Sequence, residues 1–132
     1  MAIAGATTTT LASCASTPEK KEDNKSDLAS GIILHAVYFW LKPGLSDADK
    51  ADFLNFFEVL KTIPDCRYVT YGTPAPSNPR PVVENSFDYN LIVTVDSMDQ
   101  LNIYEDHPIH QNAIAEYSKY WDKVMVHDTI IG

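Results

Sequence analysis

The residues best suited to chemistry lie in one seven-residue stretch, Tyr104 to His110, which reads Tyr-Glu-Asp-His-Pro-Ile-His. It holds a phenol and two imidazoles, and both groups can act as general acids or bases. Pro108 lacks a backbone N–H and disfavours a helical conformation at His107, so an arriving helix should end near His107 and a new one can begin at Ile109. Tyr104 and His110 would then lie on either side of the break, where their side chains can converge. The stretch therefore predicts an acid–base pair above an apolar sheet.

A further histidine lies in the strongest predicted strand, residues 32–41, which is rich in β-branched and aromatic residues and ends at a Lys-Pro-Gly turn. Side chains alternate along a strand, so His35 shares a face with Val37, Phe39 and Leu41, and the other face holds Leu34, Ala36, Tyr38 and Trp40. His35 can orient a substrate beside the pair, or it can be a sheet histidine whose hydrogen bonds are satisfied. Both faces are apolar, so we expect both to be covered.

Helical and strand patterns alternate along the rest of the chain. A helix capped by Ser46 follows the first strand and ends before Pro64, and it packs through Phe53, Leu54, Phe57 and Leu60. Next come a strand over 66–72, a loop with four prolines over 73–86 and a strand over 87–95. A capping box at Ser97 opens the broken helix, which resumes over 109–120, and a strand over 124–131 ends the chain. This β-α-β-β-α-β order is the ferredoxin-like arrangement, an α+β fold with two helices on one face of an antiparallel sheet. A second copy is the economical cover for the other face, which predicts a two-fold homodimer joined through sheets.

The first 31 residues differ in composition from the rest. Leu11-Ala12-Ser13-Cys14 followed by Ala15 resembles the lipobox of bacterial lipoproteins, in which the cysteine is acylated and becomes the mature N-terminus. Residues 16–26 contain no apolar side chain and cannot bury enough surface to fold. Residues 1–31 are therefore a signal-like segment and tether that anchors the protein in the bacterial cell envelope at Cys14, or a disordered tail on an otherwise soluble protein. Either interpretation leaves residues 32–132 as the folded domain.

Composition excludes several classes of function. A formal net charge of -8 argues against a nucleic-acid surface, which requires clustered Lys and Arg. No apolar run approaches the roughly 20 residues that span a bilayer, so any membrane contact would come through the lipid anchor alone. Two cysteines are too few for a disulfide framework. Cys66 has no flanking base, which predicts a small buried residue and not a nucleophile.

Several segments together resemble the stress-responsive A/B barrel domain (Dabb) family. They are Leu34 to Phe39, Phe87 to Asn90, Tyr104, His107-Pro108-Ile109-His110 and Asp128. The resemblance covers about residues 32–131, and its most specific part is His-Pro-x-His after a tyrosine, in register with the strand histidine. It implies a dimeric α+β barrel. Family members include plant stress proteins without an accepted catalytic role and olivetolic acid cyclase, a cofactor-free polyketide cyclase.

Similarity to the cyclase implies roles for individual residues. The catalytic tyrosine and histidine of that enzyme correspond to Tyr104 and His110, its strand histidine to His35, and a further pocket histidine to Asn90, which can hydrogen-bond but cannot titrate. His110 would remove a proton next to a carbonyl, and Tyr104 would donate a hydrogen bond to the oxygen that gains negative charge. His35, Asn90 and His107 would bind the substrate, and no metal or other cofactor would take part.

Three functional interpretations remain open. In the first, the chain is a homodimer whose small apolar pocket binds an unknown small molecule, such as an apolar or aromatic carbonyl compound. In the second, it is a cofactor-free cyclase or isomerase. In the third, it is a structural stress-associated dimer with a filled interior. In the last case Tyr104 is a core aromatic, and His107 and His110 cap and pack around the proline break. A metal site from these two histidines with His35 and Asp128 is disfavoured, because His-Pro-x-His is not a recognised ligand spacing. A cavity between helices and sheet would separate the first two interpretations from the third.

Overall fold

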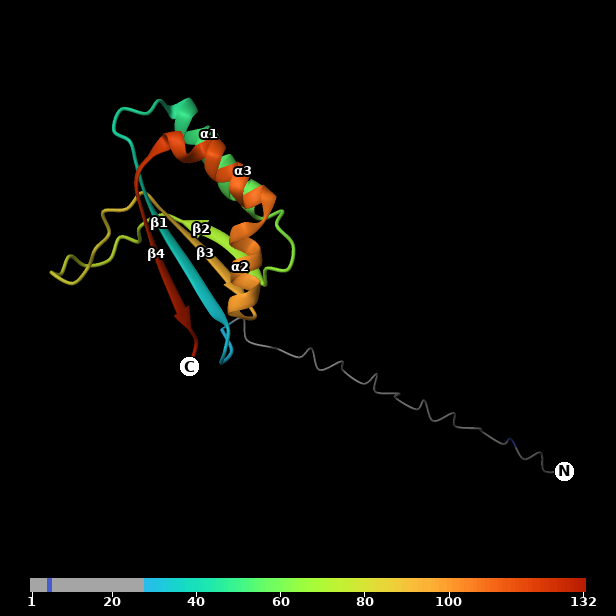
Figure 1. Ribbon diagram of the computed structural model, residues 1–132. Coiled ribbons are helices and arrows are strands. Elements are labelled where there is room, and N and C mark those ends of the chain that lie inside the picture. The colour runs from blue at the N-terminus through green and yellow to red at the C-terminus, as the bar shows by residue number, and fades with distance from the viewer. Residues whose placement is uncertain (1–4, 6–27) are drawn as a thin grey trace.

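A computed structural model describes residue 5 and residues 28–132 of the chain (Figure 1). Its elements, in order, are β1 (Ile33–Leu41), α1 (Asp47–Leu60), β2 (Tyr68–Gly72), β3 (Tyr89–Val95), α2 (Met98–Asp106), α3 (Pro108–Tyr117), the short 3-10 helix η1 (Ser118–Tyr120) and β4 (Trp121–Ile130). The predicted lipobox at Cys14 and most of the predicted tether lie outside the described residues. Within residues 28–132, no helix is both long and apolar enough to cross a membrane.

The four strands form one antiparallel sheet in the order β2-β3-β1-β4, which is the predicted ferredoxin-like topology. The strand boundaries differ from the prediction at several ends, most of all in β4, which begins at Trp121 and not at residue 124. Tertiary pairing explains the early start. A register shift between Trp40 and Leu41 lets Leu41 pair with Trp121, and the Lys42 N–H donates to the Tyr120 carbonyl at 2.9 Å.

The predicted helix starts are confirmed. Ser46 and Asp49 form a reciprocal capping box at the start of α1, and the Ser97 hydroxyl accepts a hydrogen bond from the Gln100 N–H at the start of α2. The predicted break is also present, because His107 has an extended backbone (φ -61, ψ 136) between α2 and α3. The new helix begins at Pro108, one residue earlier than predicted, since the fixed φ of proline suits the first helical position.

An aromatic core joins the helices to the sheet. The Phe39 ring of β1 lies 5.2–5.8 Å from the rings of Phe53, Phe56, Phe57 and Trp121, measured between centroids. Phe56 was not in the predicted core face of α1, yet it is buried, because α1 also packs sideways against Tyr117 of α3. Leu54, which was in that face, is only partly buried. Full burial of one such side chain contributes about 1.5–3 kcal/mol to folding, so this cluster fixes the helix layer on the sheet.

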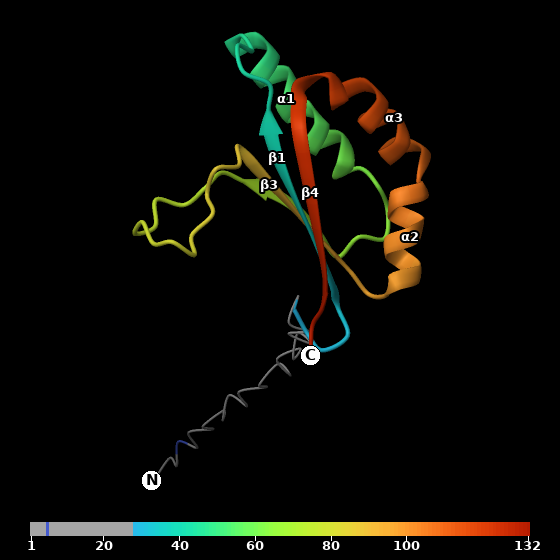
Figure 2. The same cartoon turned by 60° about the vertical axis from the view of Figure 1, so that its left-hand side comes forward.

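All the helices lie on one face of the sheet, and the loop of residues 73–88 extends to the other side (Figure 2). Loop residues reach the uncovered face at two points. Phe87 packs against Tyr38 with ring centroids 5.0 Å apart, and the Trp40 indole N–H donates to the Ser86 hydroxyl at 2.9 Å. Within the described residues, most of this second apolar face therefore has no cover from the chain itself.

Candidate functional site

A cavity of about 350 Å³ lies between the helix layer and the β1–β4 side of the sheet. Most of its lining is apolar: Val37, Phe39, Phe56, Leu60, Leu91, Ile114, Trp121, Val124 and Val126. The polar lining residues are His35, Glu105, Asp106, His110 and Gln111. Val124 and Val126 of β4 lie on the sheet face that the helices cover elsewhere, because they pair with Phe39 and Val37, yet they are 38% and 47% exposed. The cavity is therefore open along β4.

His110 reaches this cavity from the first turn of α3, directly after the proline break. Among residues 28–132, its Nδ1 is buried and has no hydrogen-bond partner. Burial lowers the pKa of His110 below its usual value, and the neighbouring His35 adds to this, while the Glu105 carbonyl and the Asp106 carboxylate partly offset it. The imidazole is therefore neutral at pH 7, the form that can accept a proton.

Tyr104 comes from the last turn of α2 and packs edge-on against His110, with ring centroids 4.9 Å apart. The sequence prediction that these two side chains converge is thus confirmed. Tyr104 is only 1% exposed, however, and is not among the residues that line the cavity. Its buried hydroxyl finds no partner within the described part of the chain, and burial raises the pKa of the phenol far above its usual value. The pair therefore faces the cavity through His110 alone, with a phenol behind it that stays protonated.

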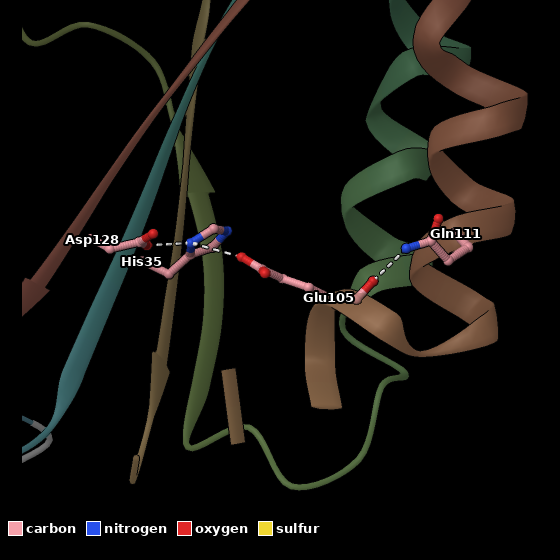
Figure 3. Close-up of polar contacts among 4 residues, drawn as sticks. All are labelled: His35, Glu105, Gln111 and Asp128. Atoms are coloured by element: carbon pink, nitrogen blue, oxygen red, sulfur yellow. Dashed lines mark hydrogen bonds and ion pairs between the residues drawn. The ribbon is translucent and has the colours of Figure 1, made fainter. Parts of the chain in front are cut away.

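His35 is buried at the polar end of the cavity, where its ring lies 5.9 Å from that of Tyr104. Its Nδ1 lies 2.6 Å from Asp128 Oδ1 and 4.0 Å from Glu105 Oε1 (Figure 3). An ionised carboxylate can only accept, so the imidazole donates its Nδ1–H to Asp128. The antiparallel register places Asp128 directly opposite His35, so β4 positions this carboxylate.

Glu105 is the site residue that sequence analysis missed. It precedes the break between α2 and α3, and the Gln111 side-chain amide donates to its backbone carbonyl at 2.7 Å across that break (Figure 3). The helical pattern of apolar residues does not indicate where its side chain points, because Glu105 is charged and follows directly after the fully buried Tyr104. From the sequence, Asp128 is a member of a disfavoured metal site with three histidines, and the parity of its strand could have linked it to His35 once the register was known.

Two residues to which the family resemblance gives a substrate-binding role, Asn90 and His107, do not line this cavity. Asn90 pairs with Tyr38 on the sheet face that points away from the helices, and its side-chain amide donates to the Val37 carbonyl at 3.2 Å. It does not line the cavity; its neighbour Tyr89 has the helix-facing position, as strand alternation requires. His107 is the N-cap of α3, and its Nδ1 accepts a hydrogen bond from the Ile109 N–H at 3.1 Å. Its role in this structure is to begin a helix.

Two further predictions concern cysteine and metal. Cys66 is half-buried, and burial raises the pKa of its thiol, so the protonated form dominates and nucleophilic character is weak. The metal-ligand set considered from the sequence is not assembled. Among the described residues, the group with ligand geometry is instead His35, Glu105 and Asp128.

Comparison with known proteins identifies relatives of the whole domain. The family model "Stress responsive A/B Barrel Domain" matches residues 33–131. The fold is similar to that of a Dabb family protein from Mesorhizobium loti (20% identity, TM-score 0.63, covering 76% of this chain and 96% of that one). It is also similar to a dimeric protein of unknown function from Bacteroides fragilis (22% identity, TM-score 0.61, covering 76% and 96%). A third similar structure is the hydroxynitrile lyase from Passiflora edulis (20% identity, TM-score 0.63, covering 79% and 96%). A search of curated protein sequences found no match, and a specific likeness to olivetolic acid cyclase has no support from these comparisons.

Proposed function

The chain belongs to the stress-responsive A/B barrel domain family, and from this starting point we propose that it is a homodimeric protein that binds a small, largely apolar molecule between its sheet and its helices. The observation that carries the proposal is the 350 Å³ cavity, whose apolar walls and few polar groups are typical of small-molecule sites. A structural protein with a filled interior would have no reason to keep this space.

The charges around the cavity restrict the ligand. The carboxylates of Glu105 and Asp106 line it, and Asp128 lies just behind His35, so an anionic ligand would be repelled. A neutral hydrogen-bonding group suits the uncharged imidazole of His110, which lines the cavity. We therefore infer a neutral aromatic or aliphatic compound that carries a carbonyl or hydroxyl group at one end.

Calorimetric titration with matched probes tests the ligand class. We expect 4-hydroxyacetophenone, which is neutral at pH 7, to bind more tightly than the anionic 4-hydroxybenzoate. Val126→Trp should abolish binding because the larger side chain fills the cavity mouth. Val82→Trp is the matched control, since Val82 is 85% exposed in the distant loop. Tighter binding of the anion, no detectable binding of neutral aromatics, or unchanged binding to the Val126 variant would each overturn the proposal.

The homodimer is inferred from the uncovered sheet face. This face presents partly buried apolar side chains from three strands, namely Leu34, Ala36, Tyr38, Trp40, Ile92 and Met125. The similar structures from Bacteroides fragilis and Thermobifida fusca are dimeric proteins with the same fold. Analytical ultracentrifugation should give a dimer, which Tyr38→Glu should convert to a monomer and Val82→Glu should not. A monomeric parent protein would refute the inference.

A second candidate function is cofactor-free proton transfer by His110. The lowered pKa of this buried imidazole and its place in the cavity lining favour it, and one of the structures with a similar fold is a hydroxynitrile lyase. His110 would accept a proton from carbon next to a carbonyl, and Tyr104 would need to turn its hydroxyl toward the developing oxyanion. Proton NMR in D₂O should show exchange at the carbon α to a bound ketone. Exchange that persists at the parent rate in His110→Ala would exclude this role.

We also propose a lipid anchor at Cys14 in the bacterial cell envelope, on the basis of the lipobox-like sequence and the apolar-free stretch that follows it. Mass spectrometry of the mature protein decides this point. A diacylated cysteine at the N-terminus is expected, and an unprocessed chain that begins at Met1 would contradict the anchor.

A further inference from the structure

Three potential metal ligands meet at the polar end of the cavity, although they come from three separate elements. His35 lies in β1, Glu105 at the end of α2 and Asp128 in β4, and their ligand atoms all lie within 4.8 Å of one another. Figure 3 shows both carboxylates directed at the same ring nitrogen, Nδ1 of His35. We propose that these three side chains bind one divalent transition-metal ion, with Zn²⁺ or Mn²⁺ as the fitting class.

The distances require only small adjustments. Nitrogen and oxygen ligands lie about 2.0–2.2 Å from a tetrahedral ion, so two ligand atoms of one ion are about 3.3–3.6 Å apart. The observed separations from His35 Nδ1 are 2.6 Å to Asp128 and 4.0 Å to Glu105. The Asp128 carboxylate must therefore move away from Nδ1 and the Glu105 carboxylate must move toward it, each by less than about 1 Å. Both carboxylate side chains are 41% exposed and can move, whereas His35 is fixed in the sheet.

Charge also favours a divalent cation. Two carboxylates and a neutral imidazole carry a charge of about -2, which a divalent ion neutralises. One nitrogen and two oxygen donors suit zinc, manganese or ferrous iron better than calcium, which takes oxygen ligands almost alone. On metal binding the His35 proton moves from Nδ1 to Nε2, so the ring stays neutral and Nδ1 becomes free to coordinate.

Such an ion would change what the cavity can do. Three protein ligands leave at least one coordination position open, as in catalytic rather than structural metal sites. His35 and Glu105 line the cavity, so the open position faces the space where a ligand oxygen would lie. The inference goes beyond the proposed binding function and does not depend on it, because the ion needs only these three side chains.

Isothermal titration of Zn²⁺ into EDTA-treated, dialysed full-length protein tests the site. We expect one ion per chain, and at least about tenfold weaker binding for Glu105→Gln and for Asp128→Asn. The matched controls are Asp106→Asn, a carboxylate in the same cavity outside the cluster, and His127→Gln, an exposed histidine on the opposite sheet face. Both controls should bind as the parent does. Val126→Trp should also retain the ion, which separates this test from that of the small-molecule site.

Long-range ¹H–¹⁵N spectra of the histidine rings give a second readout that does not depend on affinity. Zn²⁺ should shift the Nδ1 resonance of His35 and leave that of His127 unchanged. The proposal is overturned if the protein takes up no stoichiometric Zn²⁺, if Glu105→Gln and Asp128→Asn bind as well as the parent, or if the His127 variant loses the ion. A folded variant is confirmed by the unchanged ring signal of His107, which caps α3.

Discussion

Replacing Tyr104 by phenylalanine should raise the stability of the protein, although it removes a hydrogen-bonding group. The Tyr104 side chain is 1% exposed, and its hydroxyl has no hydrogen-bond partner within residues 28–132. In the unfolded chain the same hydroxyl is hydrated by water. Folding therefore strips this group of its hydrogen bonds without replacing them, and the phenylalanine variant avoids that cost.

The expected gain follows from two opposing contributions. Leaving a buried polar group unsatisfied costs about 1–3 kcal/mol. Removing one oxygen opens a void of roughly 15 Å³, which at about 24 cal/mol per Å³ costs about 0.4 kcal/mol. The net effect of Tyr104→Phe is therefore a stabilisation of about 1–2 kcal/mol, or several degrees in Tm for a domain of about this size.

Urea unfolding, followed by the fluorescence of Trp40 and Trp121, measures this change. Protein concentration must be held constant, because the stability of a dimer depends on it. The matched control is Tyr120→Phe, since the Tyr120 hydroxyl donates a 2.6 Å hydrogen bond to Asp52 Oδ2 and its loss should destabilise the protein. If Tyr104→Phe lowers the unfolding free energy as the control does, the Tyr104 hydroxyl has a partner in solution, and the reasoning from its isolation is wrong.

The outcome also bears on function. A variant that is more stable but binds 4-hydroxyacetophenone less tightly would mean that the hydroxyl is kept at a cost to stability because the site uses it. A variant that is more stable and binds equally well would assign Tyr104 to the core alone.

Three other perturbations have defined outcomes. Burial lowers the pKa of His110 in the folded protein below its usual 6.5, so near that pH the unfolded chain binds more protons than the folded one. The unfolding free energy therefore falls as the pH drops below 6.5. Urea titrations between pH 7 and 5 should show a shallower fall for His110→Gln than for the parent. Phe39→Ala should cost about 3–5 kcal/mol of unfolding free energy, because the ring is 3% exposed at the centre of the aromatic core. Ser46→Ala should cost about 1 kcal/mol through loss of the α1 cap.

Local patterns in the sequence were enough to predict the fold. Alternation in β1, the cap at Ser46 and the proline at 108 each depend on neighbours a few residues away, and each predicted its element correctly. The convergence of Tyr104 and His110 was predictable for the same reason, since both lie within one turn of the same break. Element ends were less predictable, because the start of β4 depends on pairing with Leu41, 80 residues earlier.

The partners of His35 could not be predicted from the sequence. Its contact with Asp128 spans 93 residues and depends on the register between β1 and β4, which the alternation of side chains within each strand does not determine. Glu105 approaches the same nitrogen from α2, and the aromatic core sets the distance between the helices and the sheet. Asn90 lies on the sheet face that points away from the helices, because it pairs with Tyr38 and so shares that residue's face. The sequence by itself determined the elements and the break that brings a phenol and an imidazole together, because those depend on short-range sterics and periodicity. Only the tertiary structure decided which groups surround the cavity, because that depends on how separate elements pack.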